Sequence, residues 1–357
     1  MNLKNRLRKL RQKLTEREID AIFISQPENR YYLSGFDGSA GSLLITPQKA
    51  ILATDFRYLE QAKRQAPDYE LFRVTGDTVD WFPGLVAELN LRRLGFEAGH
   101  ITFSTYQQLS DILNKAQSRL SLMPVERLVE SLRVIKEPEE IELITKAAEM
   151  TDNALEYIEG IIHTGMSEKE VAWEIEKFLR EAGSETIPFD IIVASGPNSA
   201  LPHAKPSLRA IQSGEPVLID IGAKFSGYSS DLSRTICLGN GNDTFNRVYD
   251  TVLSAQLKAM NMIRDGMTGG ETDRSARTII EPAGYGEAFG HGLGHGIGLA
   301  PHEPPRLGPD SPDHLADGMV FTIEPGIYLA GWGGVRIEDV VVMERGKIRV
   351  ISKARKS

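Results

Sequence analysis

Four acidic residues stand inside or beside apolar segments of the sequence, where an ionised carboxylate is least stable. Asp220 lies within VLIDIG and Glu324 within VFTIEP, while Asp231 and Glu338 lie within SSDLS and VRIED. An isolated carboxylate in an apolar medium is so costly that it must be paired, neutralised or bound to a metal. The acids form two pairs, eleven and fourteen residues apart, and a hairpin could bring each pair onto one face. Four converging carboxylates would repel one another, so they predict a site for multivalent cations.

A glycine-rich segment, FGHGLGHGIG at residues 289–298, could add nitrogen ligands to that site. Glycine alternates with other residues along it, and His291 and His295 fill two of the gaps. Such a run marks tight conformations or close approach of the backbone to something else. A dinucleotide loop is excluded, because the last glycine of G-x-G-x-x-G falls on His295 or Ile297, and no Walker motif occurs. Oxygen ligands with one imidazole suit a centre for Mn, Co, Fe or Zn. A structural zinc site, in contrast, is rich in thiolate ligands.

Each of these residues also has an ordinary structural interpretation. A single acid beside a strand is usually exposed or salt-bridged, and a lone histidine is more often a packed or surface residue than a ligand. The coincidence favours a metal, because two matched acid pairs are accompanied by four of the seven histidines: His203, His291, His295 and His302. Spacing alone therefore favours a two-metal site in the second half of the chain.

The first part of the chain alternates short apolar segments with helical patterns, which predicts an α/β layer. Leucines at helical spacing predict an amphipathic first helix, and the Gly/Ser segment 34–42 predicts a turn. Strands are expected at 21–25, 42–46, 50–54 and 69–74. A charge-rich stretch around 121–138 marks a boundary. We therefore expect an N-terminal α/β domain, with a mixed sheet and flanking helices, at 1–125, and a C-terminal domain at 126–357.

The C-terminal domain shows one order of elements twice, two helices followed by strands. A long helix to about residue 162 and a helix that begins with the capping box Ser167–Glu170 precede three strands. Helices at about 244–264 and 272–283 precede two further strands. This order predicts an α+β domain with an internal duplication, whose two strand pairs would be related by a pseudo-two-fold axis.

Composition narrows the classes of partner. The 357 residues carry a net charge of -8, which disfavours nucleic acid and anionic membranes. No apolar run approaches the ~20 residues that a transmembrane helix needs, and the basic start MNLKNRLRKLRQKL lacks the apolar core of a secretory signal. Cys237, in TICL, is the only cysteine, so there is no disulfide framework. These features together predict a cytoplasmic protein.

Several motifs resemble those of a known family along the whole chain. The motifs DIGAKFSGYSSDLSRT, HGLGHGIGLAPHE, TIEPGIY and VRIED are similar to the signatures of the proline-specific "pita-bread" metallopeptidases, aminopeptidase P and prolidase. In addition, SQPENRYYLSGFDGSAGSLLIT and TDFRYLEQA resemble their creatinase-like N-terminal domain. The resemblance implies the pita-bread fold for the C-terminal domain. It also implies that the N-terminal domain packs against a partner subunit in a homodimer.

The resemblance implies two divalent metal ions, Mn first and Co, Zn or Fe as alternatives. Their ligands would be Asp220, Asp231, His295, Glu324 and Glu338. Asp231 and Glu338 would bridge the ions, and Glu324 would also move the proton of the attacking water. The family's non-ligand histidines match His203, His291 and His302, which would line the substrate site and stabilise the reacting peptide. Arg336 matches an arginine that orders the site.

The implied activity is hydrolysis of the Xaa-Pro bond at the amino terminus of short peptides with proline in second position. The compact two-domain form occurs with both family activities, and our interpretation favours aminopeptidase P. A prolidase restricted to dipeptides is the alternative, since Arg306 in HEPPRLG could anchor the carboxylate of proline. A non-catalytic peptide-binding module of the same fold is a further alternative. The sequence leaves open the metal used, the preferred first residue and the oligomer size.

Overall fold

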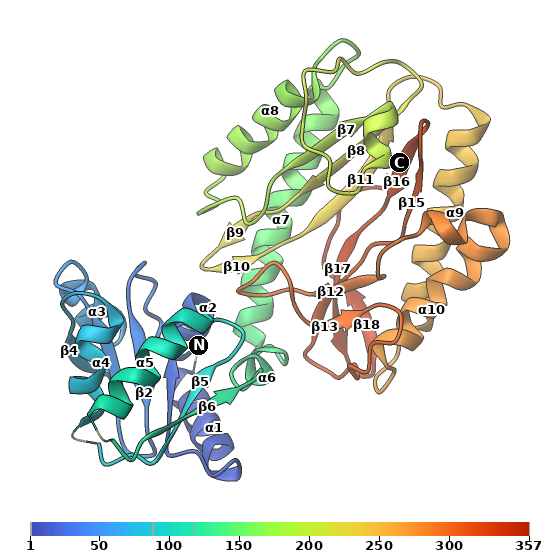
Figure 1. Cartoon of the computed structure of the whole chain (residues 1–357). Coiled ribbons are helices and arrows are strands. Elements are labelled where there is room, and N and C mark those ends of the chain that lie inside the picture. Colours follow the sequence, from blue (N-terminus) through green and yellow to red (C-terminus); the bar gives the residue numbers. More distant parts are fainter. Residues whose placement is uncertain (1, 88, 117, 357) are drawn as a thin grey trace. The chain divides into compact units, whose positions relative to one another are not determined.

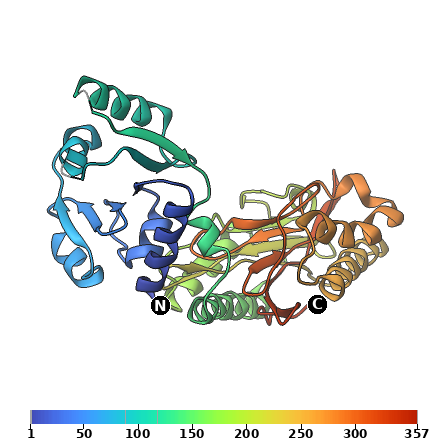
Figure 2. The same ribbon diagram turned by 90° about the horizontal axis from the view of Figure 1, so that it is seen from below.

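The computed structural model describes residues 2–87, 89–116 and 118–356 (Figures 1 and 2). The chain divides into two compact units, residues 1–133 and 134–357. The boundary expected after residue 125 coincides with the end of strand β6 (Ser121–Val125), and the short helix α6 (Glu130–Arg133) still belongs to the first unit. In the part of the chain described, no helix is long and apolar enough to cross a membrane.

The first unit is built on a six-stranded mixed sheet, which confirms its α/β class. The strand order is β4-β3-β2-β1-β5-β6, with antiparallel pairs at β1–β2 and β2–β3 and parallel pairs elsewhere. Besides β6, the strands are β1 (Ala21–Ile24), β2 (Ser42–Ile45), β3 (Ala50–Thr54), β4 (Glu70–Arg73) and β5 (Arg93–Glu97). The helices besides α6 are α1 (Leu3–Glu16), α2 (Pro27–Ser34), α3 (Leu59–Gln65), α4 (Thr78–Ala87) and α5 (Phe103–Lys115). All four predicted strands are present. The strands β5 and β6 were not predicted, because Gly95 and Pro124 interrupt their apolar patterns.

The second unit consists of two halves with the same order of elements. The helices α7 (Pro138–Ile161) and α8 (Glu168–Glu181) precede a three-stranded antiparallel sheet in the order β11-β8-β7. In the second half, α9 (Asp243–Met262) and α10 (Gly269–Ile280) precede strands in the corresponding order β17-β14-β12, inside a five-stranded sheet. Both α8 and α10 begin with a capping box. The predicted duplication is therefore confirmed in topology.

The strands of the second unit fall into four small sheets. Those of the first half are β7 (Ile192–Ser195), β8 (Pro216–Ile221), β9 (Lys224–Phe225), β10 (Tyr228–Ser229) and β11 (Leu232–Cys237). Those of the second half are β12 (Gly294–Gly296), β13 (Glu303–Leu307), β14 (Val320–Ile323), β15 (Gly326–Leu329), β16 (Gly333–Arg336), β17 (Asp339–Glu344) and β18 (Lys347–Val350). Two short 3-10 helices, η1 (Gly196–Ala200) and η3 (Gly286–Ala288), and a short π-helix, η2 (Glu281–Tyr285), lie between these strands and helices in the described part of the unit. Each predicted strand of the final region is split in two, the first at residues 324–325 and the second at residues 337–338.

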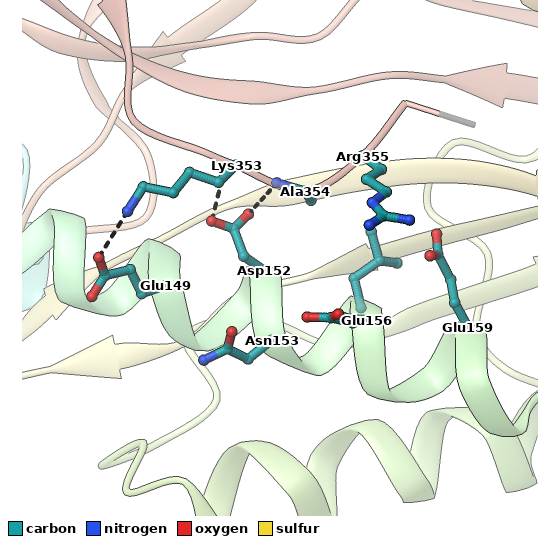
Figure 3. Close-up of a pocket in the computed structure, with 9 residues that line it drawn as sticks. Glu149, Asp152, Asn153, Glu156, Glu159, Lys353, Ala354 and Arg355 are labelled. Atoms are coloured by element: carbon teal, nitrogen blue, oxygen red, sulfur yellow. Dashed lines mark hydrogen bonds and ion pairs between the residues drawn. The ribbon is translucent and has the colours of Figure 1, made fainter.

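The C-terminal segment after β18 returns to the first half of the unit. Residues 351–356 run beside α7, where the carboxylate of Asp152 accepts the backbone N–H groups of Lys353 and Ala354 at 2.8 and 2.9 Å (Figure 3). The side chain of Lys353 also forms an exposed ion pair of 3.0 Å with Glu149. The end of the chain is thereby attached to the long helix.

Glu168, at the start of α8, anchors the loop that follows β7. It has no exposed surface, and its two oxygens accept hydrogen bonds from Ser195, Asn198 and Ser207 at 2.6 to 3.1 Å. Burial alone would raise the pKa of the Glu168 carboxyl, but these hydrogen bonds together lower it below its ordinary value. The loop held in this way carries His203.

We expect Glu168→Gln to destabilise the protein by about 1–3 kcal/mol at pH 7, because an amide leaves buried donors without an acceptor. The lowered pKa means that the carboxylate's contribution is complete above the ordinary pKa of 4.5 and is lost as the pH falls through the folded-state pKa. The difference in unfolding free energy between wild type and variant should therefore shrink below pH 4.5. Urea unfolding between pH 3.5 and 7 measures this, and a difference that grows on acidification contradicts it.

Candidate metal centre

The predicted ligands stand at the ends of paired strands, which brings residues far apart in sequence to one place. Asp220 lies near the end of β8, and Asp231 directly precedes β11, the antiparallel partner of β8. Glu324 directly follows β14, and Glu338 directly precedes β17, the partner of β14. His295 lies in β12, on the other side of β14. The corresponding strand pairs of the two halves thus each contribute two acids.

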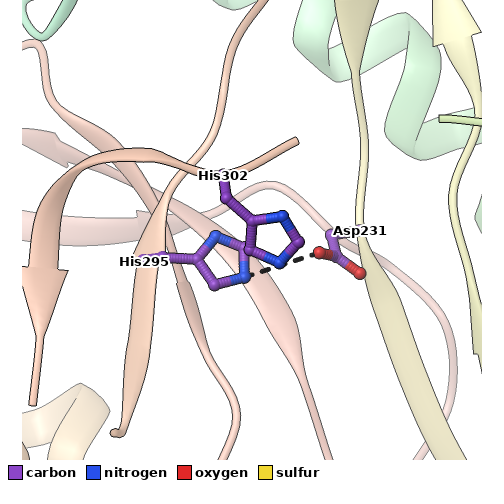
Figure 4. Close-up of side chains that lie close together, drawn as sticks. All are labelled: Asp231, His295 and His302. Carbon is purple, nitrogen blue, oxygen red and sulfur yellow. Dashed lines mark ion pairs between the residues drawn. The ribbon is translucent and has the colours of Figure 1, made fainter. Parts of the chain in front are cut away.

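The side chains meet closely enough to hold metal ions. Three groups have ligand atoms that all lie within 4.8 Å of one another: Asp220, Asp231 and Glu338; His295, Glu324 and Glu338; and Asp231, His295 and His302. The Nε2 atom of His295 lies 3.3 Å from Oε1 of Glu324 and 3.7 Å from Oδ2 of Asp231. Figure 4 shows the rings of His295 and His302 side by side and facing Asp231. The centres of the two rings are 4.2 Å apart. All five predicted ligands therefore converge, and His302 joins them.

The charges at this centre are not balanced by the protein alone. Burial raises the pKa of Asp231, Glu324 and Glu338. Neighbouring carboxylates raise the pKa of Asp231 and Glu338 further, whereas His291 and Arg336 offset part of the rise at Glu324. Oδ1 of Asp220 and Oε1 of Glu338 are buried without a hydrogen-bond partner among the described residues. Buried acceptors with no donor are costly unless a cation faces them. The residues present therefore fit divalent metal ions.

The histidines are fixed in defined tautomers by neighbouring carbonyl groups. Nδ1 of His295 donates to the carbonyl of Gly296 at 3.2 Å, so in the neutral ring the lone pair of Nε2 faces Asp231 and Glu324. Burial lowers the pKa of His295, which favours this neutral form. In metal-bound histidines, the ring nitrogen that does not bind the metal typically donates a hydrogen bond of this kind.

A second hydrogen-bonded group surrounds Arg336. Its Nη2 binds the carboxylate of Asp220, its Nη1 donates to the hydroxyl oxygen of Tyr328 at 2.8 Å, and its Nε donates to the hydroxyl of Ser233 at 2.8 Å. Tyr328 in turn lies 2.9 Å from Nε2 of His291. Tyr328 lies within the motif TIEPGIY but was not predicted as a site residue. Ser233, which donates to Oε2 of Glu338 at 2.7 Å, was not predicted either.

The centre opens into a cavity of about 730 Å³. The remaining predicted residues, His203, His291, His302, Arg306 and Arg336, all line it. Its apolar wall includes Phe189, Ile192 and Leu307. Arg306 is exposed and donates to the carbonyl of Pro309 at 2.9 Å. The cavity can therefore accept a ligand with an apolar body beside the carboxylates.

The glycines of residues 289–298 allow neighbouring backbone segments to pack closely around His295, because glycine has no side chain to keep them apart. A Cβ atom on Gly294 would lie 2.1 Å from the carbonyl oxygen of Thr322, and one on Gly296 would lie 2.1 Å from that of Pro304. A Cβ on Gly292 would lie 2.5 Å from the carbonyl of Leu307. Larger residues at these positions would push β12 away from its neighbours. The run is therefore required for close packing around His295.

Comparison with known proteins agrees with this geometry. Residues 142–345 match the model of metallopeptidase family M24, and residues 6–135 match the creatinase/prolidase N-terminal domain. The chain belongs to metallopeptidase family M24. It is therefore a metallopeptidase with the pita-bread fold, and the resemblance found from the motifs is confirmed.

Relatives of this M24 peptidase match along nearly their full lengths. The solved structure of an Xaa-Pro dipeptidase from Bacillus anthracis is 42% identical, with a TM-score of 0.95 over 100% of this chain and 99% of that chain. An Xaa-Pro dipeptidase of Pyrococcus furiosus is 37% identical over 98% of both chains. The solved X-Pro aminopeptidase from Thermotoga maritima is 36% identical, with a TM-score of 0.90 over 98% of both chains. Family membership implies divalent metals, and the carboxylate cluster is their candidate site.

Proposed function

We propose that this M24 peptidase is an Xaa-Pro dipeptidase that works with two divalent metal ions, manganese first. The observation that carries the proposal is the cavity, in which the five predicted metal ligands and the cationic Arg306 lie around one space. A dipeptide has a free carboxylate next to its proline ring, and a guanidinium is well suited to bind it. The names of the relatives from Bacillus anthracis and Pyrococcus furiosus support the same substrate class. A ligand set dominated by carboxylates suits manganese, and its single imidazole is also compatible with Co, Fe or Zn.

The residues of the centre would divide the work of hydrolysis. Bound divalent ions would lower the pKa of a water molecule and polarise the scissile carbonyl. Glu324 would accept the proton of the water and pass it to the leaving proline nitrogen. The hydroxyl of Thr322 donates to Oε1 of Glu324 at 3.1 Å, which orients this carboxylate. Because the nitrogen of the cleaved bond carries no hydrogen, the pocket needs no acceptor for it.

Two of the three non-ligand histidines beside the centre, His291 and His302, would have different roles. His291 already uses both ring nitrogens, one with the carbonyl of Gly292 at 2.8 Å and one with Tyr328 at 2.9 Å. His302 is exposed to the cavity, and no hydrogen bond holds its ring among the described residues. His302 would therefore donate to the developing oxyanion, whereas His291 would hold Tyr328 and the wall of the pocket.

Aminopeptidase P activity is the second candidate function. It is supported by the X-Pro aminopeptidase of Thermotoga maritima, which shares the fold along 98% of the chain. The two candidates differ in whether residues beyond proline are accepted. We would compare Ala-Pro with Ala-Pro-Ala and Ala-Pro-Ala-Ala as substrates of the Mn-loaded protein. Efficient cleavage of Ala-Pro alone supports the dipeptidase, and preference for the longer peptides refutes it.

Arg306→Gln should raise KM for Ala-Pro by about 10–100-fold, because a hydrogen bond to a charged group contributes about 1.5–3 kcal/mol. The variant should leave kcat nearly unchanged, since Arg306 belongs to none of the three candidate metal-ligand groups. Arg349→Gln is the matched control, because Arg349 is exposed on β18 and pairs with Glu344. Steady-state kinetics on both variants decide the matter. An unchanged KM for Arg306→Gln would remove Arg306 as the carboxylate anchor.

A further inference from the structure

Gln256 is a buried amide that the proposed reaction does not use. It lies on α9 and has no exposed surface. Its Nε2 group lies 3.1 Å from each of three acceptors: the carbonyl of Ile323, the carbonyl of Ile337 and Oδ2 of Asp339. Its Oε1 has no hydrogen-bond partner among the described residues. The donor end of the side chain is therefore the part that the structure uses.

The two carbonyls bound by Gln256 lead directly into two of the metal-ligating residues. Ile323 immediately precedes Glu324, and Ile337 immediately precedes Glu338. The peptide groups in question determine where each carboxylate side chain begins. Because one amide contacts both carbonyls, it fixes the distance between the two peptide groups.

Asp339 connects this amide to two cations. Its Oδ1 lies 2.7 Å from Nη2 of Arg234, and its Oδ2 lies 2.7 Å from Nζ of Lys356. Arg234 is only 1% exposed, and its Nη1 donates to the carbonyl of Glu338. The peptide groups on both sides of Glu338 are thus held by buried donors, Gln256 before it and Arg234 after it.

The C-terminal segment completes this network. Arg234 donates to the carbonyls of Arg355 and Ala354 at 2.9 and 2.8 Å. Asp152 of α7 holds the same segment through the N–H of Ala354 (Figure 3). These contacts bring Lys356 to Asp339. The end of the chain therefore contacts the scaffold behind Glu338.

The internal duplication shows that packing alone does not require an amide here. Gln256 lies seven residues before Ile263, the C-cap of α9. Seven residues before Ile162, the C-cap of α7, the first half has Leu155. Leu155 is 2% exposed and belongs to an apolar core. The same place in the other half is therefore filled by a hydrocarbon side chain, and the donor of Gln256 needs another explanation.

We propose that Gln256 is a positioning residue of the metal centre. It sets the separation of the Glu324 and Glu338 backbones, while Asp339, Arg234 and Lys356 hold the amide in place. This inference rests on the proposed metal-dependent function. Mutation of a residue that positions metal ligands through hydrogen bonds typically weakens metal binding 10–100-fold.

The test is the affinity of chelator-treated protein for Mn²⁺, measured by isothermal titration calorimetry without substrate. Gln256→Leu introduces the residue type of the first half and should weaken Mn²⁺ binding about 10–100-fold. Val252→Ala is the matched control, because Val252 is buried one turn earlier on α9 and offers no side-chain hydrogen bond. Both variants should lower the thermal unfolding temperature, but only Gln256→Leu should lower the affinity.

Lys356→Met keeps the test decisive if Gln256→Leu does not fold. The Lys356 side chain is 22% exposed and lies outside the helices and strands, so its loss should not unfold the unit. Several-fold weaker Mn²⁺ binding by this variant supports the inference. The inference is overturned if the folded Gln256→Leu protein binds Mn²⁺ as tightly as the wild type. If Gln256→Leu does not fold, unchanged affinity in Lys356→Met overturns the inference instead. An equal loss of affinity in Val252→Ala also overturns it. A wild type that binds no Mn²⁺ overturns the proposed function itself, which is a separate and recognisable result.

Discussion

Asp231→Asn is expected to lower kcat/KM for an Xaa-Pro substrate by about 10³-fold or more and to reduce the bound metal. Asp231 belongs to two of the three candidate ligand groups, one with Asp220 and Glu338 and one with His295 and His302. An amide has the same shape but no charge, so the variant removes electrostatic attraction for a cation with little change in packing. Metal content by mass spectrometry and steady-state kinetics with added Mn²⁺ measure both effects.

The same substitution should stabilise the metal-free protein, although it lowers activity and metal binding. Burial, with Glu338, Asp220 and Glu324 nearby, raises the pKa of Asp231. Removing one of these mutually repelling groups should therefore raise the unfolding temperature of the chelated protein. It should also abolish the rise in unfolding temperature that Mn²⁺ causes in the wild type. Asp190→Asn is the control, because Asp190 lines the same cavity but is exposed and forms only a 3.8 Å contact with Lys205. Full activity in Asp231→Asn would refute the ligand assignment.

The acidic part of the centre was predictable because charge within apolar strands is a conflict visible in the sequence. Asp220 and Glu324 stand in segments that must be buried, and their coincidence with a second pair of acids and with nearby histidines indicated a cation. The partners that hold these ligands were not predictable in the same way. Tyr328 and Gln256 act through hydrogen bonds to residues that pairing and helix packing bring near them. Gln256 is one of several polar residues along α9, and Tyr328 is marked only by its place in the motif TIEPGIY.

The fold was predictable where apolar runs were continuous and not where special residues shaped the chain. The strand β8, with the sequence PVLIDI, was recognised from its composition. The strands β12 (GHG) and β13 (EPPRL) were missed, because glycine and proline are poor strand formers. They form strands here because β14 and the close packing around His295 support them. The sequence also favoured aminopeptidase P, whereas the relatives support the dipeptidase more strongly.

Arg336→Met should destabilise the protein by about 3–5 kcal/mol, the second large effect that we expect. Arg336 is 4% exposed, and its guanidinium binds Asp220, Tyr328 and Ser233. Removing one partner of a buried ion pair leaves the other charge without compensation, and this accounts for the magnitude. Urea unfolding in chelator measures the loss. Lys353→Met provides the contrast, since its exposed pair with Glu149 should contribute less than about 1 kcal/mol.

Two further variants separate the charge of Arg336 from its shape. The double variant Arg336→Met/Asp220→Asn should recover part of the stability, because the uncompensated carboxylate is removed together with its partner. Arg336→Lys should recover stability but not activity, because an ammonium keeps the charge but cannot reach Asp220, Tyr328 and Ser233 at once. If Arg336→Lys restores both, the charge alone is sufficient and the positioning of Tyr328 by Arg336 has no role in catalysis. If the double variant is no more stable than Arg336→Met, the ion pair with Asp220 is not the source of the loss.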